Sequence, residues 1–138
     1  MIKFHSKDDK LIPVRATAHS AGYDLKASHS VLVKPYTSIQ DLTWLDTGVS
    51  VEMPDNMTML LAGRSSNPKR GLIIPQGVAV VDADYHNTIK VCFINISDKP
   101  VKIDKYDRVA QGVFVTYHTS DDKVTAQRTG GIGSTGIK

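Results

Sequence analysis

A glycine-rich run near the C-terminus is the segment best equipped to do chemistry. Residues 128–136 read Arg-Thr-Gly-Gly-Ile-Gly-Ser-Thr-Gly. Glycines let neighbouring backbone N–H groups turn toward one point, and Arg128, Ser134 and Thr135 add side-chain donors, so the segment is suited to several phosphate oxygens at once. The alternative is an unstructured tail without a function, as termini rich in Gly and Ser often are.

Two further segments combine charged and hydroxyl side chains with apolar neighbours. Asp24 follows Gly22 between apolar residues, where it could hold a metal ion through water or cap a turn. Residues 63–66, Gly-Arg-Ser-Ser, end an apolar run with one cation and two hydroxyls. They could form an anion site, or a surface turn with a solvated Arg64.

Asp82 and Tyr85 come directly after the apolar run 77–81. The end of a rigid strand is a common place for catalytic groups, although a β-turn headed by Asp82 gives the same pattern. Farther along, residues 108–111 read Arg-Val-Ala-Gln and would alternate between the two faces of a strand. An edge strand with polar residues outside explains that alternation equally well.

Composition excludes several classes of protein. The chain has 138 residues and a net charge of +3, with its charges scattered, so it is expected to form one domain with no nucleic-acid-binding surface. Cys92 lies in an apolar run and is the chain's one cysteine, which excludes an internal disulfide and indicates a reducing compartment. No apolar stretch is long enough to cross a membrane, and the first ten residues lack the apolar core of a signal peptide.

The elements that position these residues read as short strands separated by turns. Residues 66–71 could form one helical turn, and no segment carries a sustained helical stripe. The pattern predicts an all-β sandwich or jelly-roll barrel. Strand-length runs occur at 30–34, 47–52, 58–61, 77–81, 88–94, 101–103 and 108–115.

Taken in order, five of these segments resemble the five motifs of the homotrimeric dUTPases. They are Ala-Gly-Tyr-Asp-Leu, Gly-Arg-Ser-Ser, Gly-Val-x-Val-Val-Asp-x-x-Tyr, Arg-Val-Ala-Gln and Gly-Gly-x-Gly-Ser-Thr-Gly, and they span residues 20–136. The resemblance implies one jelly-roll domain over 1–138, with a barrel core at 1–126 and a flexible tail at 127–138 that is exchanged between the subunits of a trimer. It also implies Mg²⁺-assisted hydrolysis of dUTP to dUMP and diphosphate, which keeps uracil out of DNA, in the cytoplasm of a cell or of a viral host.

The resemblance also assigns residue roles. Asp82 matches the carboxylate that activates the attacking water, Tyr85 the aromatic that lies under the deoxyribose, and Asp24 the carboxylate that holds Mg²⁺ through water. The hairpin stretch 76–81 matches the segment that pairs with uracil through its main chain, and the tail would close over the γ-phosphate. The substrate-binding residues implied are Arg64, Ser65, Ser66, Gln76, Gly77, Val81, Tyr85, Gln111, Arg128, Gly131, Ile132, Gly133, Ser134 and Thr135.

Some positions depart from the family pattern. Ile132 stands where the family usually has a Phe over the uracil, Ala79 replaces a customary Gly, and only Thr129 separates Arg128 from the Gly-Gly pair. The lone tryptophan, Trp44, is interpreted as a packing or subunit-interface residue.

Two other functions stay open. The related dCTP deaminases use a Glu where this chain has Lys90 in Thr-Ile-Lys, which argues against deamination. A nucleotide-binding regulatory relative without turnover, acting on a protein partner, is the other alternative.

Overall fold

The computed structural model describes residues 1–133 and 135–136, which form twelve strands and three short 3₁₀ turns. This confirms the predicted all-β class. The strands are β1 (Lys3–Ser6), β2 (Val14–Arg15), β3 (Tyr23–Lys26), β4 (Val31–Val33), β5 (Thr43–Asp46), β6 (Val49–Glu52), β7 (Met57–Ala62), β8 (Leu72–Ile73), β9 (Val78–Val81), β10 (Lys90–Asn95), β11 (Val101–Ile103) and β12 (Arg108–Thr116), and the 3₁₀ turns are η1 (Asp9–Leu11), η2 (Ile39–Asp41) and η3 (Pro68–Arg70).

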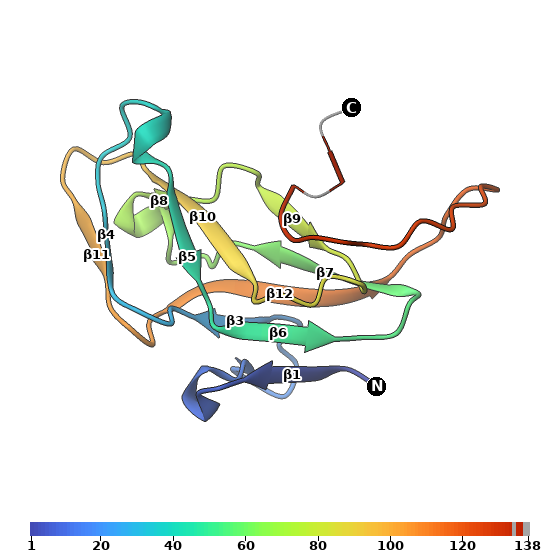
Figure 1. Cartoon of the computed structure of the whole chain (residues 1–138). Helices are drawn as coiled ribbons and strands as arrows, with labels where there is room; N and C mark the ends of the chain where they lie inside the picture. The colour runs from blue at the N-terminus through green and yellow to red at the C-terminus, as the bar shows by residue number, and fades with distance from the viewer. Residues whose placement is uncertain (134, 137–138) are drawn as a thin grey trace.

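The strands form antiparallel sheets that wrap around one core as a jelly-roll-like barrel. The largest sheet has the order β2-β3-β12-β7-β9, and a second sheet, β5-β10-β8, lies across from it (Figure 1). The pairs β4-β11 and β1-β6 complete the wall. The chain after β12 returns past β9, so the glycine-rich segment lies beside the hairpin that ends at Asp82 (Figure 1).

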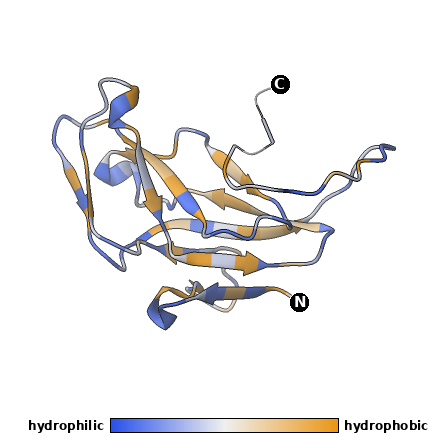
Figure 2. Ribbon diagram, viewed as in Figure 1, coloured by the Kyte–Doolittle hydropathy of each residue, from blue (hydrophilic) through white to orange (hydrophobic). Residues whose placement is uncertain are grey.

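The core fills the space between the two larger sheets. Phe93 and Leu45 from one sheet and Leu25, Met59 and Leu61 from the other are at most 1% exposed. Apolar residues accordingly follow the strands and polar ones the connecting loops (Figure 2). Because β-branched and aromatic side chains pack well on a half-buried pleated surface, burial of these faces drives the fold.

Each of the seven runs predicted as strands overlaps an observed strand (β4, β6, β7, β9, β10, β11 and β12), and η3 lies within the predicted helical turn at 66–71. Five strands were not predicted: β1, β2, β3, β5 and β8. The interpretation of residues 108–111 as an edge strand is wrong, since β12 lies in the middle of its sheet and pairs with both β3 and β7. A register shift between Arg108 and Ala110 makes the adjacent Val109 and Ala110 both buried.

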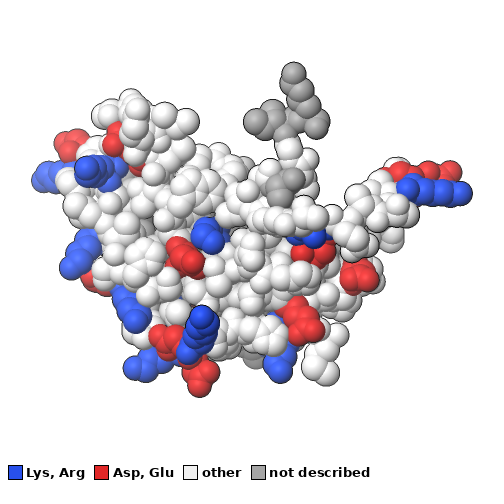
Figure 3. Space-filling model, viewed as in Figure 1, with Lys and Arg blue, Asp and Glu red and all other residues white. Residues whose placement is uncertain are grey.

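Cys92 is buried, as predicted for a small core residue. Burial raises the pKa of its thiol. Lys, Arg, Asp and Glu are interspersed over the face shown in Figure 3. Within the described residues, no helix has the length and hydrophobicity needed to span a bilayer.

Candidate active site

The β7–β9 ladder positions Asp82. Met59 pairs with Val81 at one end of the ladder and Ala62 pairs with Val78 at the other, so Asp82 emerges directly from a paired strand. The Thr58 hydroxyl donates a hydrogen bond of 2.8 Å to the Val81 carbonyl, which fixes the backbone just before Asp82. The carboxylate therefore stands on a rigid element, as a catalytic group requires.

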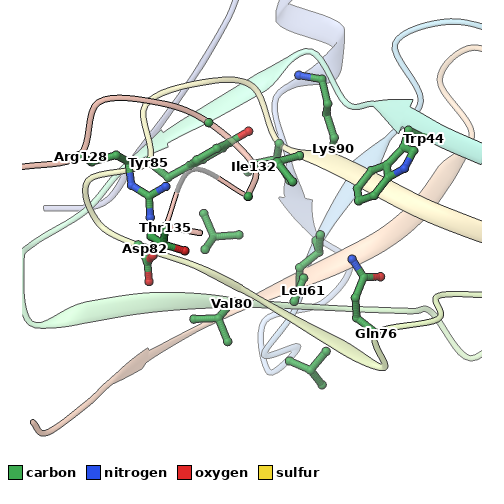
Figure 4. Close-up of a pocket in the computed structure, with 16 residues that line it drawn as sticks. Trp44, Leu61, Gln76, Val80, Asp82, Tyr85, Lys90, Arg128, Ile132 and Thr135 are labelled. Atoms are coloured by element: carbon green, nitrogen blue, oxygen red, sulfur yellow. Dashed lines mark hydrogen bonds and ion pairs between the residues drawn. The ribbon is translucent and has the colours of Figure 1, made fainter. Parts of the chain in front are cut away.

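A cavity of about 360 Å³ opens above this hairpin, and we call it the hairpin pocket (Figure 4). Asp82 and Arg128 lie at one end, while Trp44 and Gln76 lie at the other, with Leu61 and Ile132 between them (Figure 4). The first end is thus charged, and the second combines the Trp44 ring with the Gln76 amide and has Lys90 on the same side (Figure 4). The predicted site residues that line it are Gln76, Val81, Asp82, Tyr85, Arg128, Gly131, Ile132, Gly133 and Thr135.

Tyr85 forms part of the wall of the hairpin pocket. Its side chain is buried and its hydroxyl donates a hydrogen bond of 2.8 Å to the Thr88 carbonyl. Burial, and to a lesser degree the charge of Asp46, raises the pKa of the Tyr85 phenol, which keeps it neutral at physiological pH. A neutral ring anchored by its hydroxyl presents a fixed apolar surface to the pocket.

Arg128 fastens the glycine-rich segment to the hairpin. Its Nε donates to Asp84 at 2.8 Å, a terminal nitrogen donates to Asp82 at 2.5 Å, and the guanidinium carbon lies 5.8 Å from the centre of the Tyr85 ring. The hydrogen bond to Asp84, with the charges of both carboxylates, raises the pKa of Arg128. A Cβ on Gly131 would lie 2.8 Å from Nδ2 of Asn87, so glycine permits the close approach here.

A second group of predicted residues gathers where β3, β12 and the loop after β7 meet. The Asp24 side chain is 11% exposed and lies between two guanidiniums, with Arg64 Nε at 3.2 Å and Arg108 Nη1 at 3.3 Å. Gln111 pairs with Asp24 across the strands and donates from its amide to the Gly63 carbonyl at 3.0 Å. Asp24 is therefore a strand residue, and the interpretation as a turn cap is wrong.

A cavity of about 400 Å³, which we call the arginine pocket, opens beside this group. Of the predicted site residues, Arg64, Ser65, Gly77 and Gln111 line it. Asp24 and Ser66 line neither pocket, but both contact Arg64, whose Nη1 lies 3.4 Å from the Ser66 hydroxyl. Because Arg64 is tied to Asp24 and only partly exposed, the interpretation of this loop as a turn with a solvated arginine is wrong.

The two pockets share no lining residue. Arg64 follows the Ala62 end of the ladder, whereas Asp82 follows the opposite end. The four residue steps from Val78 to Asp82 separate these ends by about 13 Å of extended chain. A single copy of the chain therefore does not bring Asp82 and Arg64 to the same small group.

The described residues contain no group of three or more His, Cys, Asp or Glu side chains placed to hold a metal ion. Asp24 offers one carboxylate that is already paired with two arginines. This arrangement fits Mg²⁺ held through water and substrate phosphates, because Mg²⁺ keeps several waters and commonly takes only one or two protein carboxylates.

Four residues near the site were not assigned to it from the sequence. Trp44 lines the hairpin pocket, Asp84 binds Arg128, and Arg108 binds Asp24. Asn67 is buried and donates from its amide to the Val109 carbonyl at 2.9 Å, which anchors the loop that carries Arg64. The Asp-x-Asp spacing at 82–84 is the one signal that could have indicated Asp84. The prediction for Ser134 lies outside the described residues.

Comparison with known proteins agrees with the resemblance. The dUTPase family model matches residues 8–136. The deoxyuridine 5'-triphosphate nucleotidohydrolase of Lactococcus lactis subsp. lactis (strain IL1403) is 37% identical over 91% of this chain and 87% of its own. That of Hydrogenobaculum sp. (strain Y04AAS1) is 32% identical over 96% of this chain and 94% of its own.

Solved structures give the same answer. The Streptococcus mutans dUTPase superposes with a TM-score of 0.79, 32% identity and coverage of 88% of this chain and 98% of that one. A dUTPase mutant from phage phi11 of S. aureus has a TM-score of 0.77 at 20% identity, with coverage of 92% and 97%, and supports the fold. With its five motifs in order on this barrel, the chain belongs to the dUTPase family.

Proposed function

We propose that this protein hydrolyses dUTP to dUMP and diphosphate. The observation that carries the proposal is the hairpin pocket, where Asp82 stands at the end of β9 beside Tyr85 and Arg128. Asp82 takes a proton from a water molecule as that water attacks the α-phosphorus. The bond between the α-phosphorus and the bridging oxygen to the β-phosphorus breaks, diphosphate leaves, and the proton passes to solvent or product.

The pocket also accounts for the choice of nucleotide. Tyr85 is fixed by its bond to the Thr88 carbonyl, so it cannot move away from a ribose 2'-hydroxyl in contact with it. Gln76 and the exposed backbone at the start of β9 provide donors and acceptors for the edge of uracil. Cytosine presents a donor where uracil presents an acceptor, and a mismatched buried polar group reduces binding strongly.

Arg64, Ser65 and Gln111 bind the phosphates from the arginine pocket, and Asp24 would hold Mg²⁺ through water. A dUTPase from phage phi11 of S. aureus is described with a coordinated structural Mg(II) ion, which supports magnesium in this family. Bound Mg²⁺ neutralises charge on the phosphate oxygens. Because Asp82 and Arg64 lie at opposite ends of one ladder, the site is completed between subunits of a homotrimer.

Arg128 closes the site. In this structure its guanidinium is paired with Asp82 and Asp84, the same carboxylates that a general base and its neighbour must keep available. The γ-phosphate offers the guanidinium a stronger anion, so nucleotide draws Arg128 away from Asp82 and leaves that carboxylate to the water. We also propose that this segment is exchanged between the subunits of the trimer. The buried free thiol of Cys92 fits a cytoplasmic enzyme.

A product assay tests the proposal. Purified protein is incubated with Mg²⁺ and, in turn, dUTP, UTP, dCTP and dTTP, and nucleoside monophosphate, diphosphate and ammonia are measured. We expect dUMP and diphosphate from dUTP alone, and loss of turnover by roughly 10²–10⁴-fold in Asp82→Asn with dUTP binding retained. The control, Asp98→Asn, changes an exposed carboxylate between β10 and β11 that lines neither pocket, and it is expected to be fully active. Ammonia from dCTP, or binding of dUTP without products, would overturn the proposal.

A further inference from the structure

We infer that Trp44 forms the aromatic wall of the nucleobase end of the hairpin pocket and determines affinity for the uracil base. The inference rests on the proposed function, because it assigns a new contact within the same site. Trp44 comes from β5, a strand that carries none of the five motifs. It is thus a specificity-determining residue that the motif pattern does not contain.

The position of Trp44 in β5 places it in the lining of the hairpin pocket. The strand register sets Trp44 opposite Cys92, on the face of β10 that also presents Lys90. The indole lies at the end of the pocket opposite Asp82 and Arg128, beside Gln76 (Figure 4). If Asp82 activates the water that attacks the α-phosphorus and Tyr85 supports the sugar, the base has only the Trp44 end left to occupy.

The exposure of Trp44 carries the second step. The residue is 47% exposed in this chain, whereas the core aromatic Phe93 is fully buried. A half-exposed indole offers a large flat apolar surface that binds bases well. Ile132 faces the same pocket from the glycine-rich segment and supplies apolar contact without an aromatic ring. Trp44 therefore supplies the aromatic surface at this end of the pocket.

Because Trp44 is the chain's only tryptophan, its fluorescence reports on this site directly. The unmodified protein is titrated with dUMP and, separately, with diphosphate, and quenching of Trp44 by acrylamide is followed. We expect dUMP to change the emission saturably and to protect the indole from acrylamide, and diphosphate alone to do neither. Equal protection by diphosphate, or no response to dUMP in protein that hydrolyses dUTP, would overturn the inference.

Substitutions give the second measurement. In Trp44→Leu we expect KM for dUTP and the Kd for dUMP to rise roughly tenfold, as for the loss of one aromatic contact to a base, with kcat within about threefold. Trp44→Phe is expected to recover most of that loss. Tyr36→Leu, which removes an aromatic ring of similar exposure (44%) outside both pockets, is the matched control and keeps wild-type values.

The subunit-interface interpretation of Trp44 makes a different prediction. In that case the Trp44 emission changes when the assembly is diluted into monomers but does not change when dUMP is added. This outcome refutes the inference. Thermal unfolding and sedimentation of both variants show whether folding and assembly are intact, and the fluorescence titration needs no variant. Absence of dUTP hydrolysis in the unmodified protein would instead refute the proposed function, so the two failures are distinguishable.

Discussion

Arg128 is the side chain that joins the glycine-rich segment to the hairpin that carries Asp82. Its guanidinium is held by two carboxylates and lies over the Tyr85 ring, so most of its surface is covered although the neighbouring residues are exposed. Such a charge-assisted pair is stronger than a neutral hydrogen bond. The same fork of donors suits the γ-phosphate once nucleotide enters.

Arg128→Ala should therefore separate triphosphate from monophosphate binding. We expect kcat/KM for dUTP to fall by roughly 10–100-fold, the range for losing hydrogen bonds to a charged group, while the Kd for dUMP stays within about threefold. Steady-state kinetics and a dUMP titration measure the two quantities. Lys123→Ala, which removes a cation between β12 and Arg128, serves as the control. A matching loss of dUMP affinity would show that Arg128 does not act through the γ-phosphate.

Asp8 gives a prediction on pH and stability at the same scale. The hydrogen bond from the Tyr106 hydroxyl, and next that from the Lys10 backbone, lower the pKa of Asp8 below its ordinary value of about 3.9. A lowered pKa in the folded state means that the ionised group stabilises the fold above its ordinary pKa, and that this contribution disappears as the pH falls through the lowered value.

Asp8→Asn should thus lower Tm at pH 7, and the difference from the wild type should disappear as the pH falls from the ordinary pKa of an aspartate through the lowered pKa of Asp8. Thermal unfolding followed by circular dichroism at several pH values tests this. Asp9→Asn, a change at the adjacent carboxylate that begins η1, is the control. A difference in Tm between Asp8→Asn and wild type that stays constant down to the lowest pH would contradict the assigned cause.

Among the elements, the loop between β7 and β8 depends on one buried amide. The Asn67 side-chain amide donates to the Val109 carbonyl in β12. Its backbone N–H donates to the Arg64 carbonyl, and its carbonyl accepts from the Leu72 N–H. Removal of the amide leaves the Val109 carbonyl buried without that partner, which is costly in the interior.

Asn67→Ala should reduce the free energy of unfolding by about 1–3 kcal/mol and weaken dUTP binding, because Arg64 and Ser65 lose their anchored loop. Denaturant unfolding at fixed protein concentration and the KM for dUTP give the two readouts. Asn56→Ala, at an exposed turn between β6 and β7, is expected to change neither. Unchanged KM with full destabilisation would show that the loop keeps its shape without Asn67.

The sequence predicted the strands that carry an apolar pattern of their own, and it missed very short strands and a strand whose buried polar residue depends on distant partners. β10 and β12 read as strands because their apolar residues recur at the right spacing. β3 did not, since its buried Asp24 is tolerated only through Arg64 and Arg108, which come from two distant parts of the chain. Most residues named from the motifs line one of two pockets, but their division between these pockets follows from the β7–β9 register, which no motif encodes.

For the whole molecule, the separation of Asp82 from Arg64 predicts complementation. If each site takes its hairpin from one subunit and its arginine pocket from another, chains with Asp82→Asn and chains with Arg64→Ala should regain activity when refolded together. Random assembly from equal amounts restores both residues in about a quarter of the sites. Turnover of the refolded mixture, against the two variants refolded apart, measures the gain.

Mixing Asp82→Asn with Tyr85→Ala provides the matched control, because both residues belong to the hairpin pocket of one chain. Every hairpin in that mixture carries a lesion, so no activity should return. A gain of the same size in both mixtures, or no gain in either, would contradict a site shared in this way.

Asp24, held between two guanidiniums, also bears on how the metal arrives. One carboxylate and two arginines leave this corner with a net positive charge, which repels a bare divalent cation and attracts a nucleotide that carries its cation with it. We therefore expect no tightly bound magnesium in the absence of nucleotide, so prolonged dialysis against a chelator should leave the melting temperature unchanged. Turnover should follow the concentration of the magnesium–nucleotide chelate, because the metal would bind together with each substrate molecule and leave with the diphosphate.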